Sequence, residues 1–190
     1  MKLLRLMGDK ETSDQDFCDG AVHVLPSQVN GLGVFAGQKF ATGESILTRN
    51  GRPVSIDHPL DPSEGESEQH CATMEGGHRI YLRFPERFVN HSCDANAFIA
   101  ERGGRIELIA LRPINPREEV FVNYGVDRHR GVPFKCHCGS ASCLVVIPAD
   151  FFSLPLNSQM ELSPFLSPWF IHEHEAEYRA FEEQTGFSPP

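Results

Sequence analysis

The residues best suited to holding a metal ion lie in one short run, Cys136–Cys143, which spells C-H-C-G-S-A-S-C. Zinc in structural sites takes four ligands in a tetrahedron, with thiolate sulfurs about 2.3 Å from the ion. A C-x-C-x4-C run can wrap three thiolates around one ion, and Gly139 eases the turn between them. Local spacing leaves the fourth ligand open among Cys18, Cys71, Cys93 and His137, and reduced structural thiols without a metal are the alternative.

The elements that must position these residues read as short strands separated by glycine turns. The segments with strand character are Ala21–Leu25, Val34–Ala36, Glu44–Thr48, Phe98–Ala100, Ile106–Leu111 and Val120–Val122. Arg102-Gly103-Gly104-Arg105 lies between two of these segments and predicts a β-hairpin. Residues 50–69, rich in proline, serine and glutamate, predict a solvated loop. The pattern as a whole predicts a mainly β fold.

The C-terminal segment is the exception, because it predicts a helix. Ser167 and Pro168 suit the cap and first turn, and Gly186 lies where a helix should stop. Ile171, Tyr178 and Phe181 recur at helical spacing. Residues 146–190 carry seven acidic residues and one basic residue, so we expect an acidic helix whose apolar side packs on the domain.

Length and charge limit the possible functions. With 190 residues, the chain has room for one domain and a tail. Its formal net charge of −9 argues against direct nucleic acid binding, but it would attract a basic protein partner. The longest apolar run, Cys143–Ile147, is far shorter than the roughly 20 residues of a membrane span, and Arg5 interrupts the apolar start. We therefore expect a nuclear or cytoplasmic protein that is neither secreted nor membrane-bound.

Three separated segments together resemble the SET domain, the fold of protein lysine methyltransferases. They are Asn30–Ala36 (N-G-L-G-V-F-A), Arg87–Cys93 (R-F-V-N-H-S-C) and Glu118–Gly125 (E-E-V-F-V-N-Y-G). The cysteine run after them looks like the post-SET zinc segment, in its expected order and place. The resemblance covers roughly residues 20–147 and leaves the tail unaccounted for.

For the fold, the resemblance implies small curved β-sheets, with the Asn90–Cys93 and Tyr124 segments threaded past each other as a pseudo-knot, plus the C-terminal helix. For the metal, it implies that Cys93 joins Cys136, Cys138 and Cys143 around one structural zinc ion. The chain then divides into a flexible N-terminus (1–19), a SET domain (20–131, with an insert at about 50–80), a post-SET segment (132–147) and a tail with an acidic helix (148–190).

The activity implied is methylation of a protein lysine with S-adenosylmethionine, in which the amine attacks the sulfonium-bound methyl group in line within a narrow channel. A free lysine has a pKa of about 10.4, so exposing its lone pair near neutral pH costs about 4 kcal/mol, which desolvation in an apolar channel lowers. Tyr124 is the implied catalytic residue, because its hydroxyl can orient amine and methyl without adding charge.

The remaining roles implied by the resemblance concern the cofactor and the substrate. The expected cofactor contacts are Gly31, Leu32, Gly33, Arg87, Phe88, Asn90, His91, Tyr124 and Phe134. The candidate walls of the lysine channel are Tyr81, Phe121 and Val122, although ordinary core packing explains each of them as well. The implied substrate is a basic, lysine-containing protein or peptide, with a histone tail as the default.

Two departures from the family pattern leave alternatives open. Leu144 and Val145 follow the last cysteine where the family usually has Arg-Gly, and Val122 stands where an aromatic residue often tunes the number of methyl groups added. The alternative function is a SET-like module that binds a peptide without turnover. A zinc-ribbon adaptor for nucleic acid has little support, because the net charge has the wrong sign.

Overall fold

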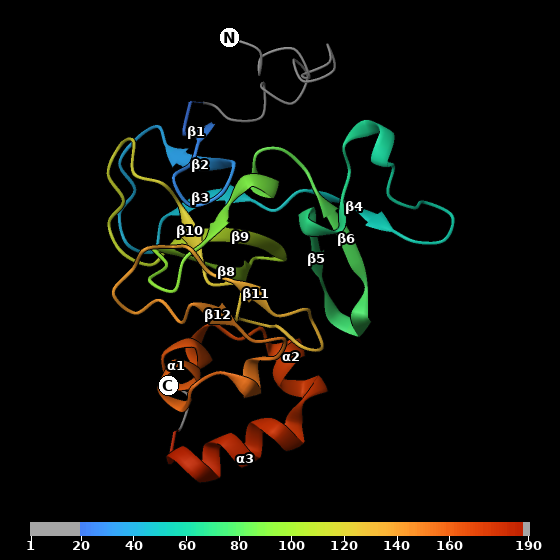
Figure 1. Cartoon of the computed structure of the whole chain (residues 1–190), viewed down its shortest axis with the longest axis vertical. Coiled ribbons are helices and arrows are strands. Elements are labelled where there is room, and N and C mark those ends of the chain that lie inside the picture. The colour runs from blue at the N-terminus through green and yellow to red at the C-terminus, as the bar shows by residue number, and fades with distance from the viewer. Residues whose placement is uncertain (1–19, 188–190) are drawn as a thin grey trace.

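The structure, a computed structural model, describes residues 20–187 (Figure 1). The stretch 1–19, predicted to be flexible, lies outside these described residues. The β-sheets occupy one end of the molecule and the C-terminal helices the other (Figure 1). Within residues 20–187, no helix combines the length and the apolar character that crossing a membrane requires.

In the part of the chain that the structure describes, twelve short strands form five small sheets, which confirms the predicted mainly β fold. The strands are β1 (Val22–Pro26), β2 (Leu32–Ala36), β3 (Ser45–Thr48), β4 (Gly51–Val54), β5 (Cys71–Thr73), β6 (Arg79–Leu82), β7 (Asn90–His91), β8 (Ala97–Arg102), β9 (Arg105–Ala110), β10 (Phe121–Val122), β11 (Phe134–Lys135) and β12 (Val146–Ile147). The sheet orders are β1-β2, β3-β9-β8, β4-β6-β5, β10-β7 and β11-β12. The hairpin predicted around Gly103 and Gly104 joins β8 to β9.

The main core lies between the β1–β2 hairpin and the β3-β9-β8 sheet. Apolar side chains from these strands and from the segments around 40, 114 and 120 bury one another completely or almost completely. They are Val22, Val34, Ala36, Phe40, Ile46, Val89, Ala97, Leu108, Ala110, Ile114, Val120 and Val122. Burial of this apolar surface supplies most of the free energy that holds the short strands together.

The segment around residues 50–80 is more ordered than the sequence predicts. Gly51–Val54 pairs with β6, and β6 pairs with β5, so the insert has its own three-stranded sheet. The prediction of a solvated loop over 50–69 was wrong for this strand, because its pairing partner lies almost thirty residues further along the chain. Pro53 fits there because β4 is an edge strand, where a missing N–H is tolerated.

The two segments expected to pass each other do lie side by side. β7 and β10 pair in parallel, with Asn90 opposite Phe121 and His91 opposite Val122. The backbone N–H of Ser92 extends the pairing by donating to Val122 O at 3.0 Å. This pairing brings the start of the Asn-His-Ser-Cys motif next to the residues that lead into Tyr124.

Between residues 148 and 187 the tail contains three helices, α1 (Leu156–Leu162), α2 (Pro168–Glu173) and α3 (Glu175–Thr185). The predicted C-terminal helix is confirmed, but it is divided into α2 and α3, because the backbone at His174 leaves the helical region (φ −121°, ψ 36°). This break lets Phe170 of α2 and Tyr178 of α3 both turn into one apolar cluster. The predicted stop is confirmed, since Gly186 ends α3 in the left-handed conformation (φ 65°).

A second apolar cluster joins the tail to the rest of the molecule. Its buried members are Phe151, Leu154, Leu166, Phe170, Tyr178 and Phe181. Val126 and Leu144 pack against it from the segments after Tyr124 and after Cys143. Leu144, one of the two departures from the family pattern, is thus apolar because it contacts the tail. Asp127 adds polar contacts, since it accepts hydrogen bonds from the N–H (2.8 Å) and the hydroxyl of Ser167.

The 3-10 turns between these elements are Pro62–Glu64, Glu68–His70, Glu75–Gly77, Glu86–Phe88, Phe151–Ser153 and Ser163–Phe165.

Candidate functional site

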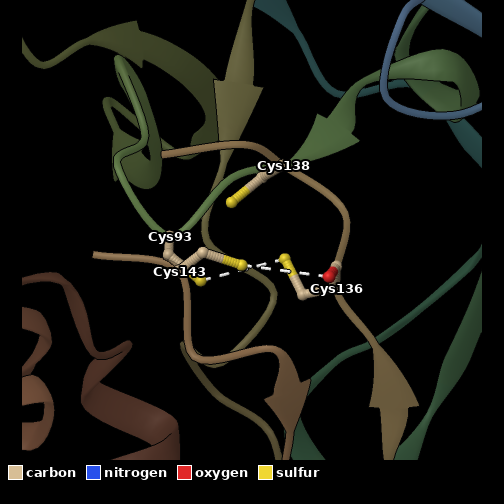
Figure 2. A group of neighbouring side chains, drawn as sticks. All are labelled: Cys93, Cys136, Cys138 and Cys143. Atoms are coloured by element: carbon tan, nitrogen blue, oxygen red, sulfur yellow. Dashed lines mark hydrogen bonds between the residues drawn. The ribbon is translucent and has the colours of Figure 1, made fainter. Parts of the chain in front are cut away.

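Four cysteine side chains converge on one point between the sheets and the tail (Figure 2). Cys93 follows β7, whereas Cys136, Cys138 and Cys143 come from the segment between β11 and β12. Their Sγ atoms all lie within 4.8 Å of one another, and those of Cys93 and Cys136 are 3.9 Å apart. In a tetrahedron with zinc–sulfur distances of about 2.3 Å, neighbouring sulfurs are about 3.8 Å apart. The four thiols therefore fit one zinc ion.

The local backbone explains how a short run brings three thiols to one place. Gly139 turns the chain in the left-handed conformation (φ 71°), which costs glycine little. Val145 has the same kind of φ (63°), which is unfavourable for a β-branched residue. The N–H of Leu144 donates to Cys93 Sγ at 3.5 Å, a contact that would stabilise a thiolate.

The other residues considered for the fourth ligand lie elsewhere or are not described. Cys71 is in β5, where its Sγ lies 3.8 Å from Ser67 O. His137 is adjacent to two of the cysteines but does not belong to the group of converging ligand atoms. Cys18 lies outside the described residues. Among residues 20–187, Cys93 is therefore the cysteine that completes the set of four.

An aromatic group lies beside the cysteines. The ring centroid of His91 is 5.4 Å from that of Tyr124 and 5.6 Å from that of Phe134, and the Tyr124 and Phe134 rings are 6.1 Å apart. His91 lies in β7, Tyr124 lies two residues after the end of β10, and Phe134 lies in β11. The tertiary structure thus brings together three of the residues that the sequence predicts to contact a cofactor.

Tyr124 is held by two hydrogen bonds. Its hydroxyl donates to Val89 O at 2.6 Å, and its backbone N–H donates to His91 Nδ1 at 3.0 Å. Although 40% of the residue is exposed, burial around the hydroxyl raises the pKa of Tyr124 to about 12. The hydroxyl is therefore fixed in direction and neutral at physiological pH.

His91 is buried, and burial lowers its pKa to about 4. Because Nδ1 accepts from Tyr124, the proton of the neutral ring lies on Nε2, which is 3.5 Å from Cys93 Sγ. One imidazole thus connects the tyrosine backbone to the cysteine cluster.

Asn90 contacts the glycine turn that the sequence analysis singled out. Its Nδ2 donates to Asn30 O (3.2 Å), to Leu32 O (2.9 Å) and to a carboxylate oxygen of Glu119 (2.9 Å). Gly31 needs to be glycine for its backbone, because its φ is +46°. The residues Gly31, Leu32, Gly33 and Asn90 therefore form one connected group.

Gly33 is one of the expected cofactor contacts, and that contact stays a prediction. A Cβ built at this position would overlap the Oε1 atom of Glu119 and lie 2.7 Å from its Cδ. The absent side chain makes room for a protein carboxylate.

Arg87 and Phe88 lie in the 3-10 turn just before β7. The guanidinium of Arg87 is 4.9 Å from the centre of the Phe88 ring, and Phe88 packs against the main core. The ring centroid of His70, in the insert, lies 5.9 Å from that of Phe88 in an edge-on arrangement. The structure thus ties this pair to the insert, and its contact with a cofactor stays a prediction.

The three candidate channel walls have different surroundings. Tyr81 is buried in the insert sheet, with the Arg52 guanidinium 5.7 Å from its ring. Val122 is buried in the main core. Phe121 points to the opposite face of β10 and, with Ser92 and Cys138, lines a surface pocket of about 250 Å³. Their role as channel walls stays a prediction.

Two residues near the site were missed by sequence reasoning. Glu119 belongs to the Glu118–Gly125 motif, but residue spacing does not reveal that its side chain is buried. Arg128 lies four residues after Tyr124 and places its guanidinium 5.2 Å from the Phe134 ring. It also donates to Pro148 O (3.0 Å) and to Val132 O, so it contacts the chain just before β11 and just after β12.

Comparison with known proteins adds an independent finding. The family model described as "SET domain" matches residues 31–125, which is half of the chain. A histone-lysine N-methyltransferase from Candida albicans, named as specific for H3 lysine-36, is 39% identical over 135 residues, which is 65% of this chain and 16% of the relative. The histone-lysine N-methyltransferase SET9 of Phaeosphaeria nodorum is 40% identical over 55 residues, which is 28% of this chain and 8% of the relative.

The chain thus spans less than a fifth of the length of these two curated relatives. Among solved structures, a Plasmodium falciparum protein described as a "putative histone methyltransferase" matches 55% of this chain and 92% of that chain, with a TM-score of 0.44 and 15% sequence identity.

Proposed function

The chain belongs to the SET-domain family, and from this premise we propose that it is a protein-lysine N-methyltransferase that uses S-adenosylmethionine. The observation that carries the proposal is the position of Tyr124, whose neutral hydroxyl is fixed by Val89 O beside His91 and Phe134. The curated relatives named as histone-lysine N-methyltransferases support the same activity.

The residues around Tyr124 suit this cofactor chemically. The rings of His91, Tyr124 and Phe134 offer aromatic surface for a purine and for a sulfonium cation. The glycine turn and Asn90 offer backbone and amide groups for the amino-acid end. When bound, S-adenosylmethionine would supply an electrophilic methyl group.

The residues of this chain would do the remaining work. The substrate lysine must be neutral to attack, and a desolvated entrance lowers its pKa from about 10.4. Tyr124 would orient the amine lone pair toward the methyl group, because its hydroxyl is polar yet uncharged. The amine would form the new nitrogen–carbon bond as the carbon–sulfur bond breaks, and its proton would leave to solvent. Alignment and exclusion of water would lower the barrier further.

Zinc would have a structural role. The four thiols of Cys93, Cys136, Cys138 and Cys143 would hold one ion with no open position for a substrate. Because Cys93 belongs to the β7 segment and the others to the β11–β12 segment, the ion would clamp these two segments together. Phe134 would thereby be held against His91 and Tyr124.

The proposed substrate is a basic protein or peptide, with a histone tail first. The net charge of −9 favours such a partner through a salt-dependent attraction, and the same charge disfavours direct binding of nucleic acid. A nuclear or cytoplasmic location follows from this substrate. The boundaries proposed are those of the sequence analysis, with the SET domain at 20–131, the post-SET segment at 132–147 and the tail at 148–190.

The test is transfer of a labelled methyl group to purified histones and to a protein lysate, with zinc-loaded protein. Transfer to a lysine residue supports the proposal. Calorimetry with S-adenosylhomocysteine adds a measurement that does not depend on knowing the substrate. A protein that binds histone peptides but neither binds the cofactor nor transfers methyl groups would be a non-catalytic peptide-binding module instead.

A further inference from the structure

The carboxylate of Glu119 is buried between the glycine turn and Asn90, and its hydrogen-bond partners are neutral groups. Oε1 accepts from Asn90 Nδ2 at 2.9 Å, and Oε2 accepts from Ser27 Oγ at 3.0 Å. Among the described residues, no basic side chain forms an ion pair with it. Burying a carboxylate without a cation costs free energy, so its presence here needs an explanation beyond stability.

Gly33 and the turn that carries Ser27 make room for the Glu119 carboxylate and bind it. Gly33 has no side chain where Oε1 lies, and any Cβ at that position would overlap this oxygen. The hydroxyl oxygen of Ser27 accepts a hydrogen bond from the N–H of Val29 at 2.9 Å, and the N–H of Ser27 donates to Gly31 O at 2.9 Å. These bonds close the turn that places the Ser27 hydroxyl against Glu119. The carboxylate is therefore the point at which the glycine turn and the β7–β10 segments meet.

The carboxylate and two backbone carbonyls together fix the direction of the Asn90 amide. Nδ2 faces three oxygens, those of Asn30 O, Leu32 O and Glu119 Oε1, at distances of 3.2, 2.9 and 2.9 Å. A flipped amide would place its own oxygen against all three, which is repulsive. The amide oxygen Oδ1 is thus directed away from this group, where it can accept a hydrogen bond from a cationic ligand.

We propose that Glu119 is a positioning residue for cofactor binding, which fixes the Asn90 amide and the Gly31–Gly33 turn in the geometry that receives the amino-acid end of the cofactor. This inference rests on the proposed function, because it assigns that end of S-adenosylmethionine to Asn90. It assigns Glu119 no contact with the lysine substrate. Its role is that of a hydrogen-bond acceptor, and a neutral acceptor of the same shape should replace it.

The experiment compares variants of the zinc-loaded full chain by calorimetry with S-adenosylhomocysteine and by steady-state kinetics. E119A should weaken cofactor binding by about tenfold or more, because Ser27 Oγ loses its acceptor, Asn90 Nδ2 loses one of three acceptors, and the space in front of Gly33 is left empty. E119Q keeps an acceptor for Asn90 and should bind within about threefold of the unsubstituted chain. The KM for the peptide should not change in either variant.

The neighbouring carboxylate provides a matched control. Glu118 pairs with Arg112 at 2.8 Å on a more exposed face, so E118A removes a carboxylate one residue away and should leave the cofactor affinity unchanged. In an N90A background, adding E119A should have little further effect, since the residue through which Glu119 acts is gone. S27A removes one hydrogen bond to the carboxylate and should raise the cofactor Kd by about threefold. In the N90A background, adding S27A should not raise the Kd further.

The possible results distinguish a failure of the proposed function from a failure of the positioning role of Glu119. Absence of cofactor binding by the unsubstituted chain contradicts the proposed function itself. If that chain binds the cofactor but E119A binds equally well, or weakens binding by the same factor with and without Asn90, the positioning role is wrong. A parallel rise in the peptide KM would point to a general structural defect and would also overturn it. If E119A does not fold, the cofactor Kd values of S27A and E119Q test the positioning role in its place.

Discussion

The backbone N–H of Tyr124 donates to His91 Nδ1, with 3.0 Å between the two nitrogen atoms. The bond fixes the tautomer of a buried imidazole whose other nitrogen lies 3.5 Å from Cys93 Sγ. A single side chain therefore relates the position of the tyrosine to that of the cysteine cluster. Changes in the cysteine cluster should consequently alter the position of Tyr124, although no cysteine contacts its hydroxyl in the described structure.

Replacing Tyr124 by phenylalanine should lower kcat by about 100-fold or more, because the amine and the methyl group lose the hydroxyl that orients them. The aromatic contacts with His91 and Phe134 remain, so the Kd for S-adenosylhomocysteine should stay within about threefold. Turnover is measured with labelled methyl groups and affinity by calorimetry. Turnover equal to that of the unsubstituted chain would remove Tyr124 from the mechanism.

The pH dependence of turnover should reflect the substrate amine and not Tyr124. Burial raises the pKa of Tyr124 to about 12, so the hydroxyl stays neutral through the range of ordinary assays. Between about pH 7 and pH 9 the rate should therefore rise up to tenfold per unit as the lysine loses its proton.

The same pKa shift has a consequence for stability. Because the folded state favours the neutral tyrosine, the contribution of Tyr124 to the free energy of unfolding is complete below about pH 10 and is lost as the pH rises toward 12. A fall in kcat near pH 10 that disappears in Tyr124→Phe would show that this hydroxyl ionises at its ordinary pKa and would contradict the prediction.

Removal of zinc should abolish methyl transfer without unfolding the β core. A strong chelator or Cys138→Ser removes the clamp between the β7 and β11–β12 segments, whereas the main core contains none of the four cysteines. Metal content is measured by elemental analysis, and the fold by circular dichroism. Cys71→Ser is the control, because this thiol lies in β5 outside the cluster, and it should retain one zinc ion per chain. Full activity in a verified metal-free sample would refute the prediction.

Val145→Gly should stabilise the zinc-loaded protein by up to about 1 kcal/mol. A positive φ of 63° is energetically unfavourable for valine, whereas glycine adopts it freely. Little burial is lost, since Val145 is 65% exposed. The N–H of Val146 donates to Leu144 O at 2.6 Å, so a tight turn is centred on Val145.

Its neighbour provides the comparison for this change. Val146 is 49% exposed but lies in β12, where glycine gains nothing, so Val146→Gly should destabilise the protein by about 1 kcal/mol. Free energies of unfolding are obtained by denaturant titration of both variants. Equal destabilisation by the two substitutions would show that Val145 is not strained.

Local patterns along the chain were sufficient for several features. The hairpin around Gly103 and Gly104, the glycine stop at Gly186 and the mainly β character follow from residues close together in sequence, because turn chemistry and strand propensity act over a few residues. The C-x-C-x4-C run likewise predicts three metal ligands, since consecutive turns can bring its thiols together without help from the rest of the fold.

Other features depend on residues far apart in the chain, and only the tertiary structure decided them. Local spacing left the fourth cysteine open, and Cys93, which the family resemblance implied, completes a cluster whose other members lie more than forty residues away. Glu119 occupies the space that Gly33 leaves empty. The break at His174 follows from burial of both Phe170 and Tyr178 in one cluster, which no helical periodicity reveals. In each case the deciding free energy comes from contacts between distant segments, and local spacing carries no information about which segments meet.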